Sequence, residues 1–126
     1  MKKTSPTRSR DKALQSLYEA DLSGCSIEEI LEDNQHQNND FYRSLVEGVF
    51  KKTEELDAII LKNTNRSISD IDPIERNILR ISILELLDSS IDRTILISEG
   101  IRLAKKYGSI EGYKFVNAVL DKFIKS

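Results

Sequence analysis

Residues 73–88, "PIERNILRISILELLD", decide the fold class of this 126-residue chain. Asp72, just before the stretch, is a residue type preferred as a helix N-cap, and Pro73 suits the first helical position. Glu75, three residues after the cap, completes a capping box. Apolar residues cover most of the circumference of the helix that these signals open, which is typical of a helix buried on all sides. The stretch therefore predicts a central helix in an all-α protein.

The residues before this helix also have helical spacing, and none of them alternates apolar and polar side chains as a strand would. Ser23 and Gly24 form a stop signal for the first helix, and Ser26 with Glu29 forms a capping box for the second. A polar, aperiodic run follows the second helix. The expected elements are helices over residues 10–22 and 26–32, a loop over residues 33–40, and a long helix from Phe41, capped by Asp40 and broken near Lys52 and Thr53.

The residues after the central helix predict two more helices. The first runs from about Ile95 to Lys106 and ends at Gly108, and Ser109 caps the second. Gly100 lies inside the first of them, where glycine costs about 1 kcal/mol relative to alanine, so we expect a close helix contact there. The whole chain therefore predicts an all-α fold of six or seven helices.

Length and composition describe a soluble protein with a core of its own. A chain of 126 residues is long enough for one compact domain and short for two. Hydrophobic residues make up 39% and charged residues 32%, and no apolar run is long enough to cross a membrane. A single cysteine, Cys25, cannot form an internal disulfide. We therefore expect one cytoplasmic domain over residues 1–126, in which residues 1–9 form a flexible basic segment.

The net charge of −2 hides an uneven distribution. Residues 1–12 carry a formal charge of +4 and residues 100–126 also carry +4, whereas the residues between them carry −10. Two basic ends on an acidic body suggest a polyanion site if folding brings the ends together, and the acidic body could attract a basic partner. The alternative, that the terminal lysines are only solvated charge, stays open.

The residue patterns of an enzyme or a metal site are missing from the sequence. There is no glycine-rich phosphate loop and no predicted strand for one to follow. Cys25 and His36 are the single cysteine and the single histidine, so paired metal ligands are absent. As a nucleophile pair they would lack a third group to orient the histidine. We therefore expect a binding protein with no catalytic activity and no cofactor.

Phe115 stands out in the last predicted helix, within "KFVNAVLD" at residues 114–121. It falls roughly 120° from the centre of the apolar stripe, on the side of Ala118 and Lys122. An aromatic ring among lysines is either covered by another part of the fold or exposed to stack on a group that is not protein. Helical spacing alone leaves both alternatives open.

Five stretches, in chain order, resemble the NusB family of bacterial transcription antitermination factors. The likeness runs over essentially the whole chain, and "KFVNAVLD" is its most specific part. The stretches are "RSRDKALQSLY" (residues 8–18), "FYRSLVEGV" (41–49), "PIERNILRISILEL" (73–86), "ISEGIRLAKKYG" (97–108) and "YKFVNAVLDK" (113–122).

The resemblance implies an all-helical fold of two small bundles packed together, and no catalytic activity. It also implies binding to the boxA element of nascent single-stranded RNA, as a heterodimer with the ribosomal protein NusE. In the family this complex joins an assembly on RNA polymerase that suppresses termination, notably during ribosomal RNA synthesis. Homodimers that hide the RNA surface are known for parts of the family, and no residue of this chain decides whether it forms one.

Carried over residue by residue, the resemblance places the RNA surface mainly on the basic ends of the chain. Single-stranded RNA is read by bases that stack on aromatic rings, so a stacked base would explain an outward Phe115. The candidate RNA-binding residues are Arg8, Arg10, Lys12, Tyr18, Arg80, Lys114, Phe115, Asn117 and Lys122, and the candidate partner-binding residues are Glu75 and Arg76.

Several candidates also have a structural interpretation. Phe115 could fill a groove against the first helix, and Asn117 could hydrogen-bond a neighbouring loop. Arg80 could pair with Glu99 as a bridge between helices. Tyr18 lies on the apolar side of its helix, where at least half of the side chain is expected in the core.

Arg8 and Arg10 are the strongest RNA candidates, because they precede the predicted first helix in a segment where a structural role is least expected. The sequence departs from the family pattern here, with two arginines where relatives often carry more, which bears on the strength of RNA binding. Ser98 and Gly100 also depart from it, since asparagine and alanine are usual at these positions.

Two other functions stay open. NusB-like domains also occur at the N-terminus of ribosomal RNA methyltransferases, and since no methyl-donor-binding segment follows here, that function requires the sequence to be a fragment. A pure scaffold would bind protein alone and leave the basic ends solvated. Salt dependence separates a scaffold from an RNA-binding protein, because neutralising Z phosphates of a single strand gives a slope near −0.7Z.

Overall fold

The structure is a computed structural model that describes residues 5–32, 39–88 and 90–126. In these residues it contains seven α-helices, one short 3-10 helix and no strand, so the all-α prediction is confirmed. Most of the expected polar loop lies outside the described residues, as do Lys2 and Lys3. The helices are α1 (Pro6–Ser23), α2 (Ile27–Glu32), α3 (Asp40–Lys51), α4 (Thr53–Lys62), η1 (Ile68–Asp70), α5 (Pro73–Asp88), α6 (Arg93–Tyr107) and α7 (Ile110–Lys125).

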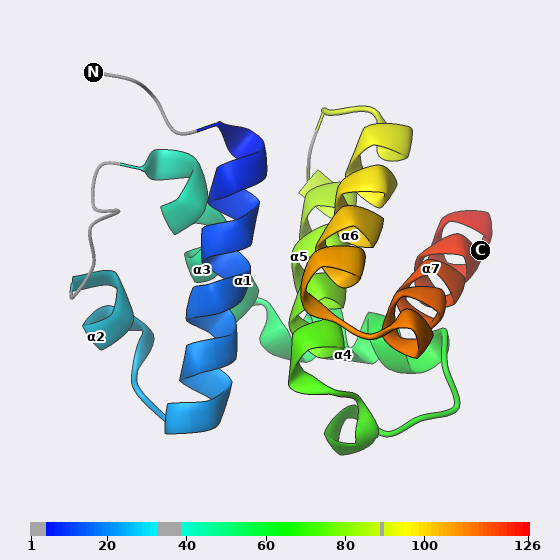
Figure 1. Ribbon diagram of the computed structural model, residues 1–126, viewed down its shortest axis with the longest axis horizontal. Coiled ribbons are helices and arrows are strands. Elements are labelled where there is room, and N and C mark those ends of the chain that lie inside the picture. The colour runs from blue at the N-terminus through cyan, green and yellow to red at the C-terminus, as the bar shows by residue number, and fades with distance from the viewer. Residues whose placement is uncertain (1–4, 33–38, 89) are drawn as a thin grey trace.

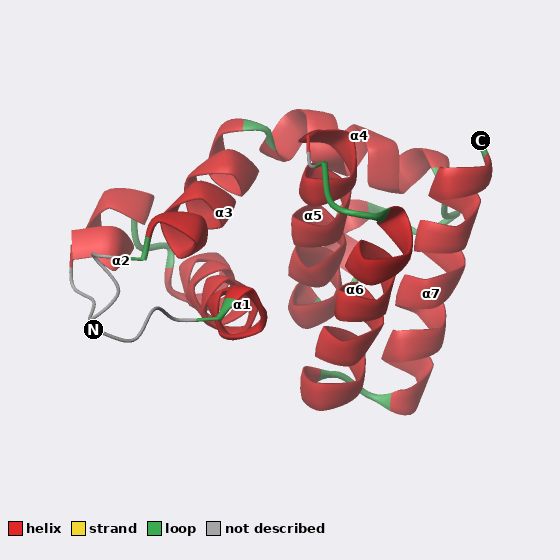
Figure 2. Ribbon diagram, turned by 90° about the horizontal axis from the view of Figure 1, so that it is seen from above, coloured by secondary structure: helices red, strands yellow, loops and turns green. Residues whose placement is uncertain are grey.

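The helices form two bundles that pack against each other, as the family resemblance implies (Figures 1 and 2). α1, α2 and α3 make up one bundle, and α4, α5, α6 and α7 make up the other. α1 and α5 are in contact at the boundary, where α3 also reaches α5. The predicted break at Lys52 is confirmed, and the chain passes there from the first bundle to the second.

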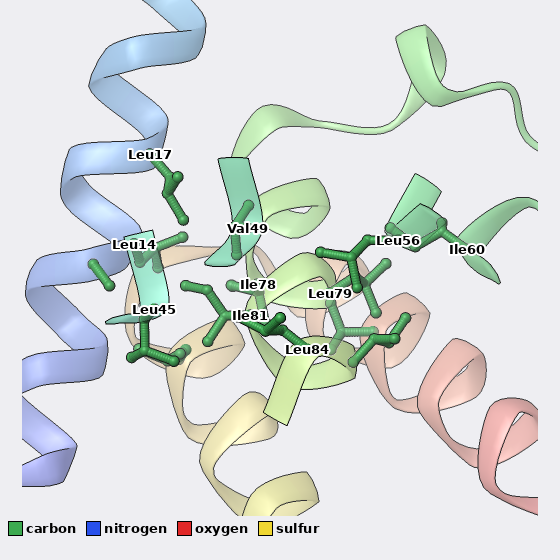
Figure 3. Close-up of a cluster of buried hydrophobic side chains, with 14 of the residues drawn as sticks. Leu14, Leu17, Leu45, Val49, Leu56, Ile60, Ile78, Leu79, Ile81 and Leu84 are labelled. Atoms are coloured by element: carbon green, nitrogen blue, oxygen red, sulfur yellow. The ribbon is translucent and has the colours of Figure 1, made fainter. Parts of the chain in front are cut away.

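α5 is the most buried helix, as its sequence predicts. Every residue from 77 to 85 is buried, including the polar ones. Figure 3 shows side chains of α1, α3 and α4 converging on this helix. Each fully buried leucine or isoleucine contributes about 1.5–3 kcal/mol, so this cluster joins the two bundles strongly. The labelled members are Leu14, Leu17, Leu45, Val49, Leu56, Ile60, Ile78, Leu79, Ile81 and Leu84.

The start of α1 differs from the prediction. The helix begins at Pro6, because the Ser5 hydroxyl caps it by accepting a hydrogen bond from the Arg8 backbone N–H at 3.2 Å. Proline at the first helical position loses no hydrogen bond. Residues 6–9 are therefore helical, and the expectation that residues 1–9 are flexible is wrong for this part of the segment.

The other helix starts mostly follow the predicted caps. Ser26 and Ser109 cap α2 and α7 as expected, and the Asp72 side chain accepts a hydrogen bond from a backbone N–H at the start of α5 at 2.8 Å. α3 is capped by Asn39 rather than by Asp40, because the Asn39 side chain accepts from the third backbone N–H of the turn at 3.0 Å. α6 begins at Arg93, two residues earlier than predicted.

Gly100 makes the close helix contact that its position predicts. A Cβ atom at this residue would lie 2.6 Å from the Ser82 hydroxyl oxygen and 3.2 Å from a Leu120 methyl group. A hydrogen atom in place of a side chain therefore lets α6 approach both α5 and α7. This approach places the neighbouring Glu99 next to α1, where the polar contacts between the bundles lie.

Candidate nucleic-acid interface

Arg10 is buried between the two bundles, with 3% of its surface exposed. Its Nε and Nη2 atoms donate to the two carboxylate oxygens of Glu85 at 2.8 and 2.9 Å, and Nη1 donates to Glu99 at 2.9 Å. The guanidinium also lies 5.2 Å from the centre of the Phe41 ring. The expectation that Arg10 has no structural role is therefore wrong, because α1 begins earlier than predicted and carries this side chain into the boundary.

Further ion pairs extend this contact along α1 and α6. Arg102 donates to Glu99 at 2.8 Å and lies 2.8 Å from Asp11. Lys106 donates to Asp11 at 2.7 Å, and the Thr7 hydroxyl donates to Glu99 at 2.9 Å. Burial alone would raise the pKa of Asp11, but hydrogen bonds from Lys106 and Arg102 outweigh burial and hold the pKa below its ordinary value. We call this set the N-terminal clamp: Thr7, Arg10, Asp11, Glu85, Glu99, Arg102 and Lys106.

Arg80 is also held inside the molecule, with 7% of its surface exposed. Its Nε and Nη2 atoms donate to the two oxygens of Asp57 at 2.8 and 2.9 Å, which is a bidentate pair. Nη1 donates to Asn77 at 3.2 Å. The predicted pairing of Arg80 with Glu99 is wrong, since Glu99 pairs with Arg10 instead.

Asp21 connects this second group to the end of α1. It accepts hydrogen bonds from Asn77 at 2.8 Å and from Arg76 at 3.1 Å. Arg76 also donates to the backbone carbonyl oxygen of Ile68 at 3.1 Å, so its guanidinium serves internal contacts. Because this set meets the C-terminal end of α1, we call it the C-terminal clamp: Asp21, Asp57, Arg76, Asn77 and Arg80.

Glu75, the other candidate for partner binding, is 8% exposed. A Cβ atom at Gly112 would lie 2.6 Å from its carboxylate oxygen, so the glycine allows the carboxylate to press against the first turn of α7. Burial raises the pKa of Glu75, the neighbouring Asp72 raises it further, and Arg66 opposes both effects. The carboxylate therefore sits in a confined place and presents little surface.

The remaining candidates are more accessible. The side-chain amide of Asn117 makes no hydrogen bond within the described part of the chain, so its structural interpretation gains no support there. Tyr18 and Lys12 are half-buried on α1, in agreement with the structural interpretation of Tyr18. Arg8, Lys114, Asn117 and Lys122 are exposed.

α6 contributes cations that the sequence analysis did not name as site residues. Arg102, Lys105 and Lys106 border a shallow depression on this helix. The Lys105 ammonium lies 5.1 Å from the centre of the Tyr113 ring of α7, and Arg102 donates to the Thr7 backbone oxygen of α1 at 3.3 Å. Folding thus brings the two basic ends of the chain together. We call Arg102, Lys105 and Lys106 the α6 basic strip.

Phe115 is half-buried and packs against the core, and the groove against the first helix stays a prediction. The guanidinium carbon of Arg66 lies 4.1 Å from the ring centre, which covers one face. Arg66 belongs to the connector between α4 and η1, and Figure 1 places that connector beside α7. No local pattern in the sequence indicates this contact, because the two residues meet only through the tertiary fold.

The described residues show neither a metal-binding cluster nor a membrane-spanning helix. They contain no group of three or more His, Cys, Asp or Glu side chains that could hold a metal ion. Cys25 is a free, half-buried thiol, and His36 lies outside the described residues. None of the helices in the described ranges is long and apolar enough to cross a membrane.

Comparisons with known proteins agree with the fold. The family model described as NusB family matches residues 7–125. The transcription antitermination protein NusB of Aliarcobacter butzleri is 37% identical over 127 residues, which cover 95% of this chain and 97% of that protein. The solved structure of T. maritima NusB has a TM-score of 0.90 at 27% identity, and the alignment covers 99% of this chain and 94% of that one.

A second solved structure contains the antitermination factors NusB and NusE in complex with double-stranded RNA. Its matching chain has a TM-score of 0.78 and 32% identity, over 94% of this chain and 95% of that one. These relatives are named as antitermination factors, and the likeness to them spans nearly every described helix. The chain therefore belongs to the NusB family of transcription antitermination proteins.

Proposed function

We propose that this chain binds the boxA element of nascent ribosomal RNA together with the ribosomal protein NusE, and so helps an RNA polymerase assembly to suppress termination. The observation that carries the proposal is the meeting of the two basic ends on neighbouring faces of α1, α6 and α7. The solved relative that holds NusB, NusE and RNA supports the same combination of ligands.

The proposed RNA surface consists of side chains of α1, α6 and α7 that are exposed or half-buried. Its cations contact phosphates, and such contacts provide most of the salt-dependent affinity for a single strand. Arg10 and Arg80 are left out of the surface, because both are buried and carboxylates of the two clamps bind their guanidinium groups. The surface comprises Arg8, Lys12 and Tyr18 on α1, Lys105 and Lys106 on α6, and Lys114, Phe115, Asn117 and Lys122 on α7.

The proposed docking site for NusE lies at the start of α5. Glu75 and Arg76 stay the candidate residues here. Because Glu75 is buried and Arg76 donates to the Ile68 carbonyl oxygen, they support this site from beneath and present little surface themselves. Asp70 and Asp72 beside them are exposed. Acidic groups at this end of α5 would attract a basic partner and raise its rate of association.

The experiment measures the affinity for a boxA RNA and for a scrambled RNA of equal length, with and without NusE, over a range of salt concentrations. We expect a preference for boxA that increases when NusE is present. Replacing both Lys114 and Lys122 with alanine should reduce the salt slope by about 1.4, the value for two lost phosphate contacts. An equal affinity for both RNAs in the presence of NusE would contradict the proposal, and a flat salt response would favour the protein-binding scaffold.

A further inference from the structure

Arg66 is an arginine that the fold holds in place without using its side-chain hydrogen-bond donors. Its guanidinium stacks on the Phe115 ring at 4.1 Å. Within the described residues this guanidinium makes no hydrogen bond and no ion pair, and the residue is exposed. The backbone N–H of Arg66 donates to the Thr64 hydroxyl oxygen at 3.2 Å. An arginine stacked in this way keeps the edges of its fork and the outer face of its plane free.

The surroundings fix the ring and the cation together. Phe115 is half-buried against the core, and this packing restricts the rotation of its side chain. Glu75 lies close enough for Arg66 to lower its pKa, and this attraction favours the stacked position of the guanidinium. The entropy that a flexible arginine normally loses when it binds a ligand is therefore partly lost already in the free protein.

The flank of α7 around this pair is cationic. Lys122 follows Phe115 by seven residues, which at roughly 100° per residue returns to the same side of the helix. It is exposed and makes no ion pair with any described residue. Lys114 is also exposed, and its only ion-pair partner among the described residues is a distant one, Glu111 at 4.0 Å. Three cations at and beside this pair match a polyanion better than an acidic protein segment, whose carboxylates are fewer and less regularly spaced.

We propose that Arg66 is an RNA-binding residue and that Phe115 is its platform, so that the base stacks on the guanidinium rather than on the ring. The exposed face of the guanidinium accepts an unpaired base, as arginine planes do in single-stranded RNA recognition. The free N–H groups of its edge donate to a phosphate or to the acceptor edge of the base. This inference rests on the proposed function, and it changes the role of Phe115 from direct contact to positioning.

The two roles of Phe115 predict opposite effects of removing Arg66. If a base stacked directly on the ring, Arg66→Ala would uncover the ring and leave the RNA affinity unchanged or higher. If the guanidinium is the stacking surface, Arg66→Ala lowers the affinity. Phe115→Leu, which keeps apolar contact with the core but removes the aromatic face, should then lower it similarly, and the double variant should lose no more than the larger single loss.

The experiment measures the affinity of the full chain with NusE for boxA RNA, for wild type, Arg66→Ala, Arg66→Lys, Phe115→Leu and the double variant. The matched control is Arg93→Ala, which removes an exposed arginine from the start of α6. We expect a loss of roughly 5- to 150-fold for Arg66→Ala, the range for one stacked base. Arg66→Lys should recover only part of it, because lysine keeps the charge but not the plane. Arg93→Ala should have little effect.

Several outcomes would overturn the inference. An unchanged or tighter affinity in Arg66→Ala would place the base on the ring. Additive losses in the double variant would show that the two residues act separately. If Arg66→Ala weakened the binding of NusE in the absence of RNA and left the RNA affinity unchanged, the arginine would instead pair with a carboxylate of NusE. A wild-type protein that does not prefer boxA would refute the proposed function itself, and the wild-type titration reveals this case before any variant is compared. Circular dichroism confirms that each variant is folded.

Discussion

Arg10 and Arg66 each lie over a phenylalanine ring, 5.2 Å from the centre of Phe41 and 4.1 Å from the centre of Phe115. The two arginines differ in every other contact. Arg10 is 3% exposed and gives three hydrogen bonds to two carboxylates of the N-terminal clamp. Arg66 is exposed, and no described residue accepts a hydrogen bond from its guanidinium group. The comparison teaches that the acceptors around an arginine decide whether it holds the fold or remains available to a ligand.

The largest effect is expected for Arg10→Ala. Removing one member of a buried ion pair leaves an uncompensated charge on Glu85, which is 6% exposed, and such losses cost about 3–5 kcal/mol. Urea unfolding followed by circular dichroism should show this decrease in the free energy of unfolding. Arg8→Ala is the control, because it removes an exposed arginine two residues earlier and should change stability by no more than about 0.5 kcal/mol. Equal effects of the two variants would break the comparison.

The next effect concerns Gly100, which brings α6 close enough for Glu99 to reach Arg10. In Gly100→Ala the new Cβ atom would lie 2.6 Å from the Ser82 hydroxyl oxygen. Overpacking costs roughly 1–3 kcal/mol and alanine regains about 1 kcal/mol of helix propensity, so we expect a net loss of up to about 2 kcal/mol. Ser82→Ala should restore part of the loss when combined with it, in a double-mutant cycle measured by urea unfolding. A cycle without coupling would contradict the assigned contact.

The smallest effect is expected for Glu75, which lies at the start of α5 near Arg66. Its pKa is raised in the folded state, so the folded protein holds the proton at a higher pH than the unfolded chain does. The contribution of Glu75 to the stability of wild type should therefore decrease as the pH rises above about 4.5, the ordinary value. Glu75→Gln lacks this loss and should melt at a slightly higher temperature than wild type at pH 7 but not at pH 4. A lower melting temperature at pH 7 would show that the carboxylate is stabilising, through Arg66 or the start of α7.

The sequence predicts the helices well because their signals are local. Apolar periodicity and the caps at Asp72 and Ser109 depend on neighbouring residues, and α5 and α7 start where these signals place them. Gly100 is also predictable, because a glycine inside a helix is costly without a close contact. The error at α1 has a local cause as well, since Ser5 and Pro6 are a cap and a first-position proline that the apolar spacing alone does not reveal.

The roles of the arginines are not predictable from the same signals. Arg8 and Arg10 are two residues apart on one helix, yet one is exposed and the other is clamped by carboxylates from α5 and α6. Arg66 lies in a connector with no periodicity, and its partner Phe115 comes from the last helix. Such contacts depend on how distant elements pack, so charge and motif resemblance indicate the class of ligand but not which cation meets it.

The most direct test measures stability and boxA affinity for Arg10→Ala and Arg66→Ala side by side, with NusE present and at a temperature where both variants are folded. We predict that Arg66→Ala lowers RNA affinity and reduces the free energy of unfolding by no more than about 1 kcal/mol, the value of an exposed cation–π contact. Arg10→Ala should lose about 3–5 kcal/mol of stability while its folded form keeps the wild-type affinity. A loss of RNA affinity in Arg10→Ala without a loss of stability, or the reverse pattern in Arg66→Ala, would contradict the division between the two arginines.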